Sequence, residues 1–121
     1  MSETHDSGID KLNHMRFLGA LTALVRLFEE FDHEKWAAWF ADVLKDYQEA
    51  FDSPGSHKRQ LAIVEHVFMA FTGLSDFTQE KFSGKDPAAL QEAQERLDKF
   101  SKQLWASARG IQAHILNAHV D

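Results

Sequence analysis

Residues 36–51 read WAAWFADVLKDYQEAF. The large apolar side chains of this stretch recur at spacings of four, three, four and four residues: Trp36, Phe40, Val43, Tyr47 and Phe51. This spacing places them on one face of an α-helix, because the helix completes a turn every 3.6 residues or so. The strict alternation of apolar and polar residues that a half-buried strand requires is missing. The stretch therefore predicts a core-facing helix, capped by Asp32 and running to about Phe51.

Two further helices are predicted on either side of this one. The first covers residues 9–31, with Asp6 or Ser7 as its N-cap, and residues 1–7 are expected to form a flexible tail. The other covers residues 57–71. Because it is apolar around most of its circumference, we expect it to be the central helix of the fold.

One long helix is predicted for the last third of the chain. Apolar residues step by three or four from residue 87 to residue 118, and the register continues through Gly110. Asp86 is the expected N-cap and Pro87 the first helical residue. At 1.5 Å per residue this helix would be about 48 Å long, so it should extend past the helix of residues 34–51.

The stretch FTGLSDFTQE, residues 71–80, contains a Gly-x-Ser string. A hydrolase nucleophile elbow would need a second glycine at position 77 and a preceding strand, and neither is present. We favour a structural role, in which Gly73 ends the preceding helix and Ser75 or Asp76 caps a short one. Three aromatic side chains are expected to hold this connection against the core: Phe71, Phe77 and Phe82.

These segments together predict an all-α fold: a bundle of four main helices with a short extra helix or helical loop between the third and the fourth. The clearest break is DSPGSH, residues 52–57, where Pro54 and Gly55 interrupt the helix and Ser56 can cap the next. With 121 residues, 44% of them hydrophobic, residues 8–121 are expected to form a single helical domain with its own core.

Composition excludes several classes of function. The chain contains no cysteine, which rules out a disulfide scaffold, a thiolate zinc site and a cysteine nucleophile. The formal net charge of −6 disfavours nucleic-acid binding, which needs a basic face to neutralise phosphates. Neither a signal peptide nor a membrane-spanning apolar run is recognisable, so we expect a cytoplasmic protein without membrane association.

The seven histidines do not predict a metal site. A helical metal site needs histidines four residues apart, or two Glu-x-x-His motifs. His114 and His119 are five residues apart, and the one Glu-x-x-His motif, Glu30 to His33, has no second copy. We therefore expect no metal, no cofactor and no enzyme activity, with a histidine-based metal or hydrolytic enzyme as a minor alternative.

An acidic edge follows the helix of residues 34–51. Asp42, Asp46 and Glu49 are spaced so that they share one side of the helix, and Trp39 lies beside them. One interpretation is a solvated surface partly balanced by Lys45. The other is a docking surface for a basic protein, because opposite potentials steer encounter and fix register. Trp39 is then either a partly exposed anchor for that partner or a side chain packed at the rim of the bundle.

Two short stretches resemble a group of small, uncharacterised bacterial helical proteins. They are HEKWAAWF…VL at residues 33–44, a His-x-x-Trp-x-x-Trp helix start, and AFTGLSDF at residues 70–77, a Phe-x-Gly corner. The second stretch departs from the group's glycine-rich pattern at Thr72 and Ser75. The resemblance implies neither enzyme activity nor a cofactor. It implies a protein similar to the small acidic immunity factors that are often encoded beside bacterial toxins.

The expected function is therefore a cytoplasmic protein-binding module, a bacterial immunity protein that neutralises a cognate toxin by binding and occluding it. Its predicted partner-binding residues are Asp42, Asp46, Glu49 and Trp39. The alternative is a homo-oligomeric structural or regulatory protein, with an interface on the last helix formed by Trp105, Ile111 and Ile115.

Overall fold

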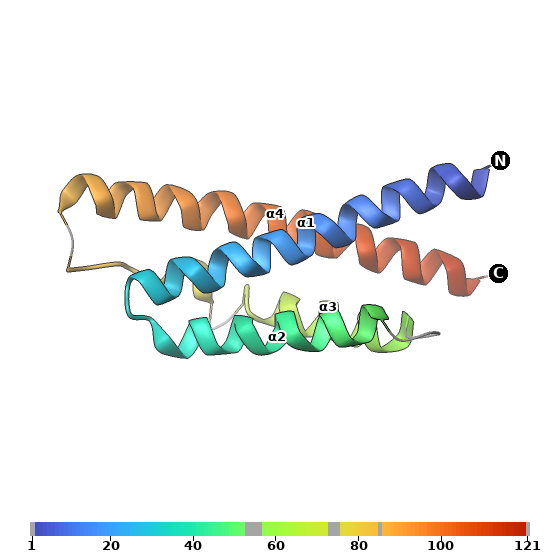
Figure 1. The fold of residues 1–121 in the computed structure, drawn as a ribbon, viewed down its shortest axis with the longest axis horizontal. Helices are drawn as coiled ribbons and strands as arrows, with labels where there is room; N and C mark the ends of the chain where they lie inside the picture. Colours follow the sequence, from blue (N-terminus) through green and yellow to red (C-terminus); the bar gives the residue numbers. More distant parts are fainter. Residues whose placement is uncertain (1, 53–56, 73–75, 85, 121) are drawn as a thin grey trace.

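The fold was analysed in a computed structural model that describes residues 2–52, 57–72, 76–84 and 86–120. The described residues form four α-helices and one short 3-10 helix, without a strand (Figure 1): α1 Ser2–Glu30, α2 Glu34–Asp52, α3 His57–Met69, η2 Phe77–Gln79 and α4 Pro87–Val120. The predicted all-α bundle of four main helices with a short helical segment before the last one is confirmed.

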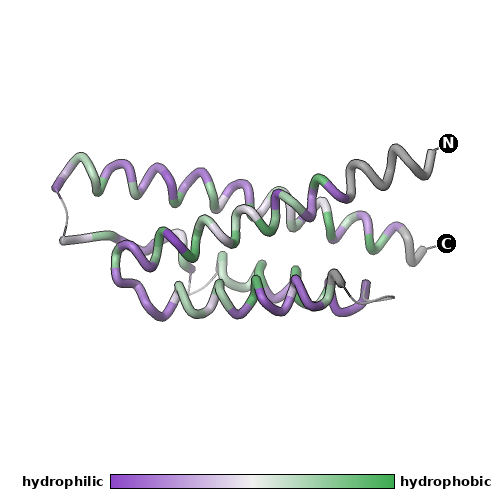
Figure 2. Tube along the Cα trace, in the orientation of Figure 1, coloured by the Kyte–Doolittle hydropathy of each residue, from purple (hydrophilic) through white to green (hydrophobic). Residues whose placement is uncertain are grey.

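The two longest helices, α1 and α4, run antiparallel, and both ends of the chain lie at the same end of the molecule (Figure 1). They form the most extensive helix pair, while α2 packs on α1 and α3 packs on α2 and α4. Hydrophobic and hydrophilic residues alternate in short blocks along the helices (Figure 2), as expected when each helix buries one stripe. The core contains these large, fully buried side chains: Phe17, Leu21, Leu24, Leu27, Phe28, Phe40, Tyr47, Val64, Phe77, Leu104, Ile111 and Ile115.

The prediction that the third helix is central is wrong. On α3 only Gln60, Val64 and Val67 are buried, and Met69 exposes 69% of its surface. This helix has 13 residues and meets α2 and α4 along one side. Of the four helices, α3 packs the least extensively on its neighbours and α1 packs the most extensively, on α2 and α4.

The predicted start of the first helix is also wrong. Helix α1 begins at Ser2, so residues 2–7 have helical backbone and the expected caps, Asp6 and Ser7, lie inside the helix. Aspartate and serine favour helix starts but do not interrupt a helix, and no proline lies in this segment to end it. The flexibility of residues 1–7 and the single-domain boundary at residue 8 stay predictions.

Asp32 ends α1 and does not cap α2. Its φ of 61° is left-handed, the His33 amide donates to the carbonyl of Phe28 at 2.8 Å, and the Asp32 amide donates to that of Glu29 at 3.2 Å. This pair of hydrogen bonds is the Schellman motif that closes helix C-termini. His33 is the N-cap of α2, since its carbonyl accepts the first intrahelical bond, from Ala37 at 3.0 Å. The aspartate was misassigned because both positions favour the same residue type.

The predicted boundaries of the later helices are largely confirmed. Helix α3 begins at His57 and ends at Met69, two residues before the predicted end. Asp86 caps α4, because its Oδ1 accepts a hydrogen bond from the Ala89 amide at 2.8 Å. The proposed turn residues 53–56 and the proposed caps Gly73 and Ser75 lie outside the described residues.

Helix α4 is continuous through Gly110, as predicted, and spans 34 residues. Gly110 is the point where α1 comes close: a Cβ added there would lie 2.6 Å from Nδ2 of Asn13. Gly19 on α1 differs, because the nearest atom to an added Cβ is Nε2 of Gln103, at 3.8 Å. The absence of a side chain at Gly110 therefore lets α1 and α4 pack closely.

This difference predicts unequal effects of two glycine substitutions. We expect Gly19→Ala to raise the free energy of unfolding by about 0.5–1 kcal/mol, since alanine is the better helix former. Gly110→Ala should gain clearly less or lose stability, because Asn13 must move. Urea denaturation of both variants measures the difference, and an Asn13→Ala background should remove it. Equal gains at the two sites in the wild-type background would contradict the close approach.

Candidate functional site

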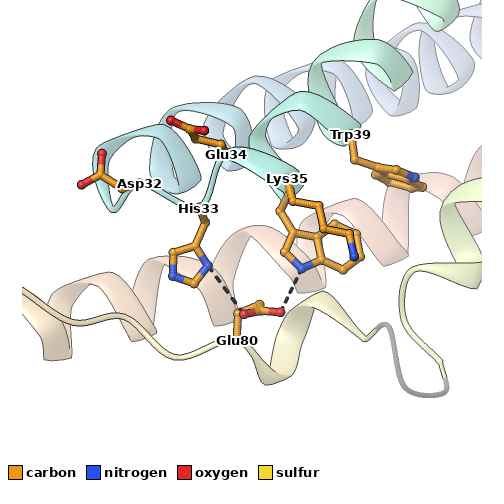
Figure 3. Close-up of a pocket in the computed structure, with 7 residues that line it drawn as sticks. Asp32, His33, Glu34, Lys35, Trp39 and Glu80 are labelled. Atoms are coloured by element: carbon orange, nitrogen blue, oxygen red, sulfur yellow. Dashed lines mark hydrogen bonds and ion pairs between the residues drawn. The ribbon is translucent and has the colours of Figure 1, made fainter.

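An open pocket of about 570 Å³ lies at the corner between α1 and α2, facing the segment that follows η2 (Figure 3). Its lining combines aromatic and charged side chains: Asp32, His33, Glu34, Lys35, Trp36, Trp39 and Glu80. Six of these seven residues come from one short stretch, the α1–α2 corner and the first turns of α2. Glu80 is distant from this stretch in the sequence and lines the opposite wall of the pocket.

Glu80 is held by two side chains of that stretch. The indole Nε1 of Trp36 donates a hydrogen bond to Glu80 Oε1 at 3.0 Å, and His33 Nδ1 lies 3.6 Å from Oε2 (Figure 3). The Glu80 side chain nevertheless keeps 37% of its surface exposed. A carboxylate can accept about four hydrogen bonds, so the group is oriented and still has capacity for a ligand.

The backbone around Glu80 is fixed by the core. Asp76 caps η2, with Oδ1 accepting from the Thr78 amide at 2.9 Å, and Phe77 is fully buried. The Glu80 amide donates to the Phe77 carbonyl at 3.2 Å, and the Gln94 side chain of α4 donates to the Glu80 carbonyl at 3.4 Å. The predicted roles of Asp76 as a cap and of the phenylalanines as anchors of this connection are confirmed.

Two tryptophans form the aromatic wall of the pocket. The rings of Trp36 and Trp39 lie 5.7 Å apart at 77° to one another, and the Trp36 ring also contacts Phe77 at 5.9 Å. Trp39 is half-buried and packs beside His66 of α3, with ring centroids 5.1 Å apart. Packing on both sides fixes these indole rings and leaves part of their surface open to the pocket.

Carboxylates outnumber basic side chains in the lining of the pocket. The pocket carries the carboxylates of Asp32, Glu34 and Glu80 against the single ammonium group of Lys35. A smaller hollow of about 350 Å³ lies next to it, and Asp32 and Glu34 line both. Glu29 adds a further carboxylate there. The corner between α1 and α2 therefore attracts cations.

The structure places the predicted acidic edge on the surface of α2. Asp42 and Asp46 are exposed. Glu49 forms an exposed ion pair with Arg59 of α3, in which Glu49 Oε2 lies 3.4 Å from Arg59 Nη2. Trp39 connects this acidic edge with the pocket, because it lines the pocket and precedes Asp42 by one helical turn. The four predicted residues therefore share one side of α2 and differ in their surroundings.

Sequence reasoning did not single out Glu80, His33 or Trp36 as site residues. The signal was present in the resemblance, since the His-x-x-Trp-x-x-Trp stretch supplies three of the lining residues. Glu80 had no signal of its own: it is 44 residues from Trp36, and only the folded chain brings the two together.

The residues predicted for a homo-oligomeric interface are not all accessible. Ile111 and Ile115 are buried within the chain's own core, whereas Trp105 exposes 41% of its surface. The pattern that suggested an overhanging interface is the stripe that α4 buries inside the bundle. Among the described residues, no group of three or more histidine, aspartate or glutamate side chains is placed to hold a metal ion.

Neither a protein-family model, nor a curated protein, nor a solved structure matches this chain. The resemblance to small bacterial helical proteins stays a prediction. No helix within the described part of the chain is long and apolar enough to cross a membrane.

Proposed function

We propose that the chain is a cytoplasmic protein-binding module that recognises a basic protein, and that it acts as a bacterial immunity protein which neutralises a toxin by occluding it. One observation supports this proposal most. The exposed residues Asp42 and Asp46 lie on the same side of α2 as Trp39, which lines the acidic, aromatic pocket. Aromatic anchors beside charged residues are typical of protein interfaces.

Electrostatics supports a basic partner in particular. The carboxylates of Asp42 and Asp46 are exposed one helical turn apart, an arrangement that costs an isolated helix a few tenths of a kcal/mol. A basic surface docked on α2 would remove that repulsion and speed association. Occlusion requires only that the bound module cover the toxin's active site, so this chain needs no catalytic group.

The double substitution Asp42→Lys and Asp46→Lys tests the proposal. We expect it to abolish protection of cells against the partner toxin, because it reverses the charge at the proposed contact. The free energy of unfolding should change by no more than about 0.5 kcal/mol, because both side chains are exposed. The melting temperature should therefore stay close to that of the wild type. Protection assays and thermal denaturation measure the two effects.

The matched control is Glu92→Lys with Glu95→Lys on α4, which changes the net charge by the same amount at exposed positions. Protection should survive in this control. If the Asp42/Asp46 variant still protects cells, or if the α4 control fails equally, the assignment of the surface to α2 is wrong.

A further inference from the structure

The pocket at the α1–α2 corner combines three features suited to one kind of ligand. It holds a carboxylate oriented by Trp36 and His33, a wall of two fixed indole rings, and an excess of negative charge. Cations bind to indole faces and pair with carboxylates, and a site that offers both favours a planar cation over an anion or an apolar group.

We propose that this pocket receives an arginine side chain of the basic partner protein, with Glu80 pairing with the guanidinium. One of the two indole rings packs on the plane of the guanidinium and the other meets it edge-on, because the rings of Trp36 and Trp39 lie at 77° to one another. This inference rests on the proposed function, since it names the chemistry by which that partner is recognised. The guanidinium fits better than an ammonium, because it is planar, stacks on aromatic rings and presents a fork of N–H donors to a carboxylate.

The geometry around Glu80 leaves its carboxylate accessible to a ligand. Glu80 keeps 37% of its side-chain surface exposed, whereas His33, which supports it, keeps 21%. Because Trp36 and the core beneath η2 already fix the group, little conformational entropy remains to be lost on binding.

The position of the pocket accounts for the choice of a partner's side chain over a free small cation. The pocket is open, and Trp39, which lines it, lies on the same side of α2 as the exposed carboxylates of Asp42 and Asp46. A protein docked on that edge would extend over the pocket and could place a side chain in it. A free cation would be bound by the pocket alone.

The test uses the full chain and a short glycine-rich peptide that carries one arginine, with otherwise identical peptides that carry lysine or citrulline. Proton–nitrogen correlation spectra follow the three indole N–H signals, assigned by Trp→Phe variants. We expect the arginine peptide to shift the signals of Trp36 and Trp39 saturably, and to leave Trp105, which lies outside the pocket, unchanged. The lysine peptide should bind more weakly, and the neutral citrulline peptide should not bind.

Glu80→Gln should weaken binding of the arginine peptide about tenfold, since it removes the charge but keeps an acceptor for the Trp36 indole. Glu92→Gln, an exposed charge change on α4, should leave binding unchanged. Equal shifts with arginine and citrulline, or equal binding by the Glu80→Gln variant, would overturn the proposal.

These outcomes are separable from the proposed function. If the Glu80→Gln variant retains the basic partner while the Asp42/Asp46 variant loses it, the pocket proposal fails and the protein-binding function stands. If the arginine peptide binds as expected but the wild-type chain captures no basic protein, the proposed function fails.

Discussion

The Phe77→Ala variant is expected to lose about 3–5 kcal/mol of unfolding free energy, the cost of removing a phenylalanine from a packed core. Phe77 is fully buried, and its ring contacts Phe40 and Phe71 at centroid distances of 4.9 and 4.8 Å. The backbone amide of Phe77 also donates a hydrogen bond to the Ala70 carbonyl at 3.0 Å. This bond holds the segment before α4 against the end of α3.

Chemical denaturation monitored by circular dichroism measures this loss. Met69→Ala is the matched control, because Met69 is a large apolar residue close in sequence that is 69% exposed, and it should change stability by no more than about 0.5 kcal/mol. A loss below about 1 kcal/mol for Phe77→Ala would show that the connection before α4 is not anchored in the core.

Tyr47→Phe is expected to lower the unfolding free energy by about 1–3 kcal/mol, the usual cost of disturbing a buried hydrogen bond. The Tyr47 hydroxyl and His14 Nδ1 are hydrogen-bonded to each other, joining α1 to α2, and both residues are buried. The substitution keeps the ring, which packs on Phe17 with centroids 4.7 Å apart. The predicted loss therefore belongs to the hydroxyl and not to a cavity.

A double-mutant cycle with His14→Ala separates the loss of this hydrogen bond from any change in packing. In that background the additional cost of Tyr47→Phe should largely disappear, since the hydroxyl has lost this partner. If Tyr47→Phe costs the same with and without His14, the hydrogen bond between the two helices does not contribute to stability.

The sequence was sufficient to predict the helices whose periodicity and caps agree. The stripe from Trp36 to Tyr47 predicted α2, and Asp86 followed by Pro87 predicted the start of α4. These features are local, because caps and helical periodicity act within a few residues.

Features that depend on distant contacts were predicted poorly. The apolar circumference of α3 did not reveal that this helix packs the least extensively of the four, and that α1 packs the most extensively. Asp32 was assigned to the wrong helix end, because only the backbone dihedral angles distinguish the end of α1 from the start of α2. The sequence indicated one half of the candidate site, because the stripe of α2 supplies its aromatic wall. It did not indicate Glu80, which ends the stretch of residues 71–80 but belongs to none of the patterns found there.

The most direct measurement is capture of partners from cells of the native host, with the wild-type chain, the Asp42→Lys/Asp46→Lys variant and the Glu92→Lys/Glu95→Lys control compared side by side. The proposed function predicts one stoichiometric basic protein that is retained by the wild type and the control, is lost from the Asp42/Asp46 variant, and is toxic when expressed alone but harmless with the wild-type chain. Recovery of the wild-type chain alone or only with itself, or equal retention of the basic protein by all three, would contradict it.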